Sequence, residues 1–278
     1  MDLSKKMLED LKQIELDILR EFVEVCEQLD LRYYLLGGTL LGAVRHQGFI
    51  PWDDDIDVGM PREDYDIFVR KAQKMLPSHL FIQTIETDPG YVNCFAKIRN
   101  SDTTFIESSA VHMRINHGVF MDVFPLDYYP EDAQEQIKLD SRKKWLLRRI
   151  GVEFKLSAYN TPKGRAKKRI IKMLYPSVSA AIKKREQLYR STPHSGLMAN
   201  HGGAWGKKEI IPTSWYGDGT TVTFEGMRLR APAEYDKWLT QVYGDYMQLP
   251  PVEKRVGHHY VDVVDFGKSY KEYTEKAK

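Results

Sequence analysis

The chain has 278 residues, a mass of 32.3 kDa and a formal net charge of +2, which suits one large domain or two small ones. Hydrophobic residues make up 42% and charged residues 29% of it, so wholesale disorder is excluded. No apolar run approaches the roughly 18–20 residues that span a bilayer, and the N-terminus lacks the apolar stretch of a signal peptide. With only Cys26 and Cys94, we expect a cytoplasmic protein with reduced thiols and no disulfide scaffold.

Apolar spacing and turn residues predict an α/β protein, in which the N-terminal half alternates helices with short strands. The expected helices are 4–29 with Ser4 as N-cap, 39–45, 62–76 and 233–243. The expected strands are 33–36, 55–60, 80–85, 91–99, 103–106 and 118–124, a hairpin at 220–224 and 227–230, and a strand-like tail after Glu253. This order predicts an α/β core over 1–128, a basic helical insertion over 129–195 and a C-terminal part over 196–278 that packs back on the core.

Charge is distributed unevenly along the chain. Between Lys138 and Arg190 there are 17 lysines and arginines against three acids, a net charge of +14, so the rest of the chain carries −12. This section interleaves apolar and basic residues, as interfacial helices do, and peripheral contact of 138–190 with an anionic membrane or an anionic glycan precursor is one hypothesis. An ordinary solvated face is the alternative. The chain has no recognised nucleic-acid motif, and we expect no nucleic-acid partner.

The densest chemical signal is an acidic motif at 53–57. Its carboxylates are Asp53, Asp54, Asp55 and Asp57. In a strand, Asp55 and Asp57 would point the same way, and Asp53 would join them as the loop enters the strand. Carboxylates this close repel one another unless a cation lies between them. Mg²⁺ is the natural choice because it leaves sites for phosphate oxygens, and Mn²⁺ is the alternative.

Phosphate-binding candidates flank this motif. Gly37, Gly38 and Thr39 precede or open a short helix, where free backbone amides favour an anion. Further candidates are Arg45 and His46 at the end of that helix and Lys97 and Arg99 on one predicted strand, although each is also compatible with an ordinary structural role.

A third acid is expected from a neighbouring strand. Asp122 lies in an apolar run, where a carboxylate needs a partner, and we predict that it joins the metal site and acts as general base. Asp127, which follows Pro125, is instead expected to cap the next turn.

Five segments resemble the LicD family, which includes fukutin and fukutin-related protein and belongs to the nucleotidyltransferase-fold superfamily. They are residues 34–65, 95–100, 117–127, 241–251 and 258–260, and the basic middle matches poorly. The resemblance implies a nucleotidyltransferase-like mixed sheet with helices. It also implies transfer of phosphocholine from CDP-choline, or of another alcohol phosphate such as ribitol phosphate from its CDP-alcohol, to a cell-surface glycan or teichoic-acid-type precursor, with CMP leaving. Lipid-linked acceptors are among those that the resemblance implies.

The resemblance also assigns roles to residues. Asp55 and Asp57 match the metal-binding DxD motif, Gly37 and Gly38 match the nucleotide-phosphate loop, and Asp122 matches the third acid; Asp53 falls in the same acidic block. The predicted metal ligands are therefore Asp53, Asp55, Asp57 and Asp122.

Three other interpretations stay open. One is a DxD glycosyltransferase that uses a nucleotide-sugar, one is a non-catalytic membrane- or anion-binding adaptor, and one is a nucleotidyltransferase that makes the CDP-alcohol. His258 and His259 are candidates for substrate or metal binding, with a structural role as the alternative, and Trp52 is expected to cover the acidic loop.

Overall fold

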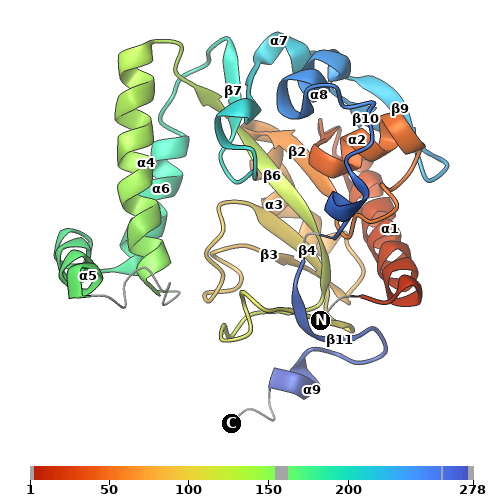
Figure 1. The fold of residues 1–278 in the computed structure, drawn as a ribbon, viewed down its shortest axis with the longest axis horizontal. Coiled ribbons are helices and arrows are strands. Elements are labelled where there is room, and N and C mark those ends of the chain that lie inside the picture. Colours follow the sequence, from red (N-terminus) through yellow and green to blue (C-terminus); the bar gives the residue numbers. More distant parts are fainter. Residues whose placement is uncertain (1–2, 154–161, 258, 275–278) are drawn as a thin grey trace.

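The computed structural model describes residues 3–153, 162–257 and 259–274, and it confirms the expected mixed α/β fold (Figure 1). The main sheet has the order β1-β2-β6-β4-β3, with β7 and β8 joined to it through β6. Its strands are β1 (Tyr34–Leu35), β2 (Asp57–Pro61), β3 (Leu80–Gln83), β4 (Ala96–Asn100), β6 (Val119–Tyr129), β7 (Leu197–Asn200) and β8 (Ile210–Pro212).

Strand β6 is the centre of this sheet. It pairs parallel to β2 along one side, from Asp57 opposite Asp122 to Pro61 opposite Leu126. On its other side it pairs antiparallel to β4 up to Val123 and to β7 from Leu126 onward. The change of neighbour falls at Pro125, which has no amide proton to donate to a ladder. The predicted strand 118–124 was therefore too short, because β6 continues beyond this proline.

Helices cover the sheet and share the apolar core with its strands. They are α1 (Lys5–Gln28), α2 (Gly37–His46), α3 (Arg62–Lys71), α4 (Ala133–Glu153), α5 (Pro162–Leu174), α6 (Val178–Tyr189), α7 (Thr213–Tyr216), α8 (Tyr235–Tyr243) and α9 (Lys271–Thr274), with 3-10 turns η1 (Ala72–Lys74), η3 (Gly206–Glu209) and η4 (Val252–Lys254). Ser4 caps α1 as predicted, accepting a hydrogen bond from the Met7 amide. Phe22 of α1 is fully buried between Tyr33 and Phe68.

The basic section forms α4, α5 and α6, which stand together at one side of the sheet (Figure 1). A small apolar cluster joins α4 to α6 through Leu146, Ile150 and Ile182. Arg149 is buried at their base, where its Nε donates to the carbonyl of Tyr175 at 2.6 Å.

The C-terminal part returns to the core. β7 and β8 extend the main sheet, β9 (Thr220–Phe224) and β10 (Met227–Ala231) form the predicted hairpin, and β11 (Val261–Asp265) pairs antiparallel with β5 (Thr104–Glu107). The boundaries proposed near residues 128 and 195 stay predictions.

Two sequence-based boundaries were wrong near the acidic motif. Helix α2 begins at Gly37, two residues earlier than expected, and β2 begins at Asp57, so Asp55 lies in the preceding loop. Strand alternation therefore does not explain how Asp55 and Asp57 come together.

Asp127 does not cap a turn, because it lies within β6. Its two carboxylate oxygens accept hydrogen bonds from Arg62 Nε and Nη2, both at 2.6 Å, and its side chain is 1% exposed. This bidentate pair balances the charge of the buried Arg62 guanidinium.

We predict that Asp127→Asn lowers the free energy of unfolding by about 3 kcal/mol, because it leaves the buried Arg62 charge without its carboxylate. Urea denaturation of the full chain measures the change. Asp10→Asn, on the exposed face of α1, is the matched control and should leave the midpoint unchanged. Equal midpoints for the two variants would contradict the prediction.

Candidate active site

Two predicted metal ligands lie side by side where β2 begins beside β6. Asp57 and Asp122 are register partners in β2 and β6, and the Asp122 amide donates to the Ile56 carbonyl at 2.9 Å. Parallel neighbours in register place their side chains on the same face of the sheet. The pairing of distant segments thus brings Asp122 to the acidic motif, as the sequence predicted.

Glycines at the start of α2 let the carboxylates approach the backbone. Gly37 has φ +53°, and a Cβ atom there would lie 2.7 Å from Asp57 Oδ2. A Cβ on Gly38 would lie 2.4 Å from Asp53 Oδ2. A side chain at either position would collide with a carboxylate of the site, so both positions require glycine.

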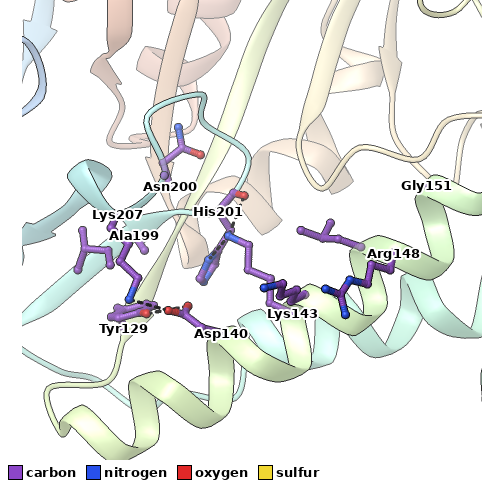
Figure 2. Close-up of a pocket in the computed structure, with 13 residues that line it drawn as sticks. Tyr129, Asp140, Lys143, Arg148, Gly151, Ala199, Asn200, His201 and Lys207 are labelled. Carbon is purple, nitrogen blue, oxygen red and sulfur yellow. Dashed lines mark hydrogen bonds and ion pairs between the residues drawn. The ribbon is translucent and has the colours of Figure 1, made fainter. Parts of the chain in front are cut away.

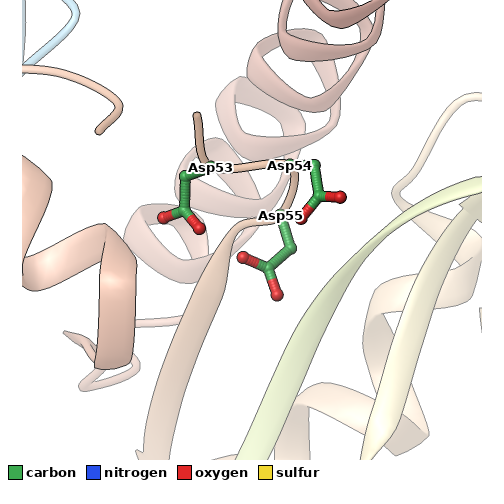
Figure 3. Close-up of side chains that lie close together, drawn as sticks. All are labelled: Asp53, Asp54 and Asp55. Carbon is green, nitrogen blue, oxygen red and sulfur yellow. The ribbon is translucent and has the colours of Figure 1, made fainter. Parts of the chain in front are cut away.

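The loop before β2 gathers three carboxylates. Asp53, Asp54 and Asp55 each offer an oxygen, and these oxygens lie within 4.8 Å of one another (Figure 3). Asp53 and Asp55 line the same cleft as Asp57 and Asp122, whereas Asp54 does not. Asp54 instead accepts from the amide of His259 at 3.0 Å and contacts its Nδ1 at 3.2 Å.

The electrostatics of these acids fit a divalent cation. Burial, followed by repulsion from Asp55 and Asp54, raises the pKa of Asp53 well above its usual value. Burial, followed by repulsion from Asp55 and Asp122, does the same to the pKa of Asp57. Asp53 Oδ2 is buried and has no hydrogen-bond partner within the described ranges. An all-oxygen, negatively charged donor set of this kind suits Mg²⁺ or Mn²⁺.

Lys97 and Arg99 do not line this cleft. Lys97 is buried, with Nζ 2.8 Å from Asp122 Oδ1 and 3.2 Å from the centre of the Phe120 ring. Arg99 is 1% exposed and donates to Gln83 Oε1 and the Gly118 carbonyl, both at 2.8 Å. Both line a smaller cavity of about 350 Å³. Lys97 therefore acts on the site through Asp122, and a direct role in phosphate binding stays a prediction.

Of the phosphate-binding candidates predicted around Gly37 and Gly38, some hold the site in place from within and others line the cleft. Thr39 is buried, and its Oγ1 accepts from the Asp57 amide at 2.8 Å. Arg45 lines the cleft and donates from Nη1 to the Tyr246 carbonyl at 2.8 Å, so it also anchors the C-terminal segment. His46 accepts from Arg45 Nε, with the pKa of His46 lowered by burial and then by Arg45.

Segments far along the chain complete a cleft of about 760 Å³ around the acids. Its opposite wall comes from the turn after β7 and from the chain after α8, and Trp52 lines the cleft near Arg255, which lies 5.5 Å from its ring centre. His259 also lines it; burial alone would lower its pKa, but the hydrogen bond to Asp54 and the Asp55 charge raise the pKa of His259 to about 9. His258 lies outside the described residues.

Two acids of this region were missed by sequence reasoning. Glu15 is buried on the core face of α1, where burial and then Asp55 and Asp54 raise its pKa well above the usual value. Glu209 lines the cleft and accepts from the Trp205 amide at 2.8 Å; burial raises the pKa of Glu209 to about 7. Glu15 had a readable signal, an acid on an apolar helix face between Leu11 and Leu19. No sequence signal distinguishes Glu209 from an ordinary surface acid in its glycine-rich segment.

The raised pKa of Glu209 predicts a pH dependence of stability. The pKa of Glu209 in the folded chain is about 7, above its ordinary value of 4.5. The stabilisation that this shift contributes is therefore fully present below pH 4.5 and is lost as pH rises through 7. Relative to Glu209→Gln, the wild type should lose about 3 kcal/mol of unfolding free energy across that interval. Urea titrations at pH 4.5, 6 and 8 measure it, with Glu27→Gln on the exposed face of α1 as the matched control. A Glu209→Gln profile parallel to the wild type would refute the assignment.

None of the helices in the described ranges combines the length and apolar character required to cross a bilayer.

Comparison with known proteins identifies the family. Residues 30–177 match the family described as LicD/FKTN/FKRP, nucleotidyltransferase domain. The chain is 30% identical over 272 residues to the lipopolysaccharide cholinephosphotransferase LicD of Haemophilus influenzae, covering 92% of this chain and 97% of that protein. It is 53% identical over 135 residues to the mouse ribitol 5-phosphate transferase FKRP, covering 49% of this chain and 23% of that protein. An uncharacterised protein of Rickettsia prowazekii is 33% identical over 129 residues, covering 46% of this chain and 44% of that protein. This chain therefore belongs to the LicD/FKTN/FKRP family of nucleotidyltransferase-domain proteins.

Proposed function

We propose that the protein is a Mg²⁺-dependent phosphotransferase that moves phosphocholine, or a related alcohol phosphate, from a CDP-alcohol to a cell-surface glycan or teichoic-acid-type precursor and releases CMP. The observation that carries this proposal is the cleft in which Asp53, Asp55, Asp57 and Asp122 face one another. The relatives support it, since one is a cholinephosphotransferase and another a ribitol 5-phosphate transferase.

The chain's own residues would perform binding and positioning. Asp53, Asp55 and Asp57 would hold the divalent ion, which when bound supplies neutralisation of the diphosphate and of the departing CMP. Gly37 and Gly38 open α2 beside the same acids, so the first-turn amides lie where a donor phosphate would meet the ion. The acids and the amides would together provide the positioning and electrostatic stabilisation that phosphoryl transfer requires.

The acceptor hydroxyl needs a base, and two carboxyl groups of the cleft qualify. Asp122 matches the third acid that the resemblance to the family implies; burial raises its pKa, although Lys97 opposes that shift. Glu209 faces the cleft from the opposite wall and has a pKa of about 7, close to the ideal for proton transfer at neutral pH. Either carboxylate would take the proton as the hydroxyl oxygen attacks phosphorus.

The exposed surface of α5 favours peripheral contact with an anionic membrane. Arg165, Arg169 and Lys172 recur at helical spacing and form a basic stripe. Ile170 and Met173 lie on the adjoining stripe and are 52% and 76% exposed. A cationic stripe beside an exposed apolar one suits a helix lying in the lipid interface, and we include this contact in the proposed function.

We predict that Asp55→Asn and Asp57→Asn each lower the rate of CMP release from CDP-choline by about 10³-fold or more, because each removes a negative ligand from the ion that stabilises the transition state. The assay covers CDP-choline, CDP-ribitol and CDP-glycerol with lipid-linked and free glycan acceptors. Chelation should abolish release, and Mg²⁺ or Mn²⁺ should restore it.

Asp218→Asn, an exposed acid outside the cleft, is the matched control for these variants. Full activity of either cleft variant would refute the metal assignment. Stabilisation by a nucleotide-sugar with Mg²⁺, but by no CDP-alcohol, would instead support a glycosyltransferase. CTP-dependent synthesis of the CDP-alcohol would support the nucleotidyltransferase alternative.

For the membrane contact, we predict that Ile170→Ser combined with Met173→Ser reduces co-sedimentation with phosphatidylglycerol vesicles by about tenfold, since burial of two large apolar side chains is lost. Phosphatidylcholine vesicles should bind little of either protein. The exposed substitution Val111→Ser, outside the basic section, is the control. Unchanged co-sedimentation of the double variant would exclude α5 as the contact, and vesicle binding without any CMP release would favour the adaptor.

A further inference from the structure

A second cavity, of about 500 Å³, lies between α4 and the segment that follows β7 (Figure 2). Lys143 and Arg148 extend into it from α4, and His201 and Lys207 face them from the other side. Tyr129, at the end of β6, also lines it. The role of this cavity is not explained by the catalytic acids, which lie in the neighbouring cleft.

The cavity carries an unbalanced positive charge. Among the described residues that line it, the cations are Lys143, Lys144, Arg148 and Lys207, and the one acid is Asp140. Asp140 is already engaged, because it contacts Lys207 Nζ at 3.0 Å and accepts from the Tyr129 hydroxyl at 2.9 Å. Within the described ranges, Lys143, Lys144 and Arg148 form no ion pair with a carboxylate.

Lys143 is the most enclosed of these cations. Its Nζ lies 3.3 Å from the His201 carbonyl oxygen and 3.4 Å from His201 Nδ1. An ammonium group only donates, so Nδ1 accepts and the imidazole proton resides on Nε2. Burial, followed by the Lys143 charge, lowers the pKa of His201 to about 3, which keeps the ring neutral. His201 therefore positions the ammonium without balancing its charge.

The cavity shares a wall with the catalytic cleft. Asn200 lines both spaces. After it, His201, Gly206 and Lys207 face the cavity, whereas Gly203, Trp205 and Glu209 face the cleft. The same short segment therefore separates the cavity from the cleft that holds the acids.

We propose that this cavity binds a phosphate group carried by the acceptor substrate, with Lys143, Lys144 and Arg148 as its cationic ligands. The apolar side chains of Leu147, Ile210 and Tyr129 line the same space and would pack against the sugar or lipid body that bears the phosphate. The identification of the ligand as the acceptor rests on the proposed function, but the phosphate site itself does not. Lysine and arginine side chains without carboxylate partners suit an anion, and the apolar side chains beside them suit the apolar part of an amphiphile.

Direct binding tests the site without any turnover. The full chain is first saturated with Mg²⁺ and CDP to fill the catalytic cleft, and is then titrated by calorimetry with glucose 6-phosphate, with dihexanoyl phosphatidic acid and with glucose. We expect at least one phosphate probe to bind and glucose not to bind. We expect Lys143→Gln and Arg148→Gln each to weaken that binding by about tenfold, the size of one charge-assisted hydrogen bond.

Lys138→Gln is the matched control, since Lys138 is an exposed residue of the same helix outside the cavity. Preference for the sugar phosphate or the lipid phosphate identifies which end of the acceptor is bound. The proposal is overturned if neither phosphate probe binds, if glucose binds as well as they do, or if both cavity variants retain wild-type affinity. Thermal unfolding of each variant verifies that it is folded.

The same titrations separate this inference from the proposed function. CMP release without phosphate binding in the cavity would leave the function standing and remove the inference. Phosphate binding sensitive to Lys143→Gln, in a chain that releases no CMP, would leave the site standing and remove its identification as the acceptor site.

Discussion

The mutual repulsion of buried carboxylates at the start of β2 is the constraint on which the rest of the site depends. Asp53 and Asp57 lie against the backbone of α2, at a distance that only Gly38 and Gly37 permit. Such an arrangement is costly without a compensating charge. Two nearby cations each pair with a single acid, Lys97 with Asp122 and His259 with Asp54. The carboxylates that line the cleft thus form a preorganised, negatively charged site suited to a hard cation and the phosphate that it binds.

Contacts between segments far apart in the sequence hold this arrangement. Arg45 donates to the carbonyl of Tyr246, and Glu225 in the β9–β10 turn accepts from the Phe49 amide at 3.0 Å. His259, near the end of the chain, fixes Asp54 and so orients the loop that carries Asp53 and Asp55. The C-terminal part therefore both lines the acidic cleft and holds its loops in place.

The basic helices provide two surfaces of different character. Lys143 and Arg148 of α4 line a cavity beside the cleft, whereas most cations and several apolar side chains of α5 are exposed to solvent. The high local charge that the composition revealed is thus distributed between the wall of a cavity and an exposed helix face. Arg149 belongs to neither, because its guanidinium satisfies backbone carbonyls at the base of the helices.

Sequence alone determined the features that depend on near neighbours in the chain. Periodicity and turn residues predicted α1, α8 and the β9–β10 hairpin, and the motif around Asp55 and Asp57 indicated both the chemistry and the family. Tertiary structure decided the features that depend on pairing between distant segments. It placed Lys97 and Arg99 behind the cleft, paired Asp127 with Arg62, and brought Glu15 and Glu209 to the acids. Local patterns report which face of an element is apolar, but the partner of a buried charge is chosen by the packing of the whole chain, because burial and an opposing charge act across space and not along the sequence.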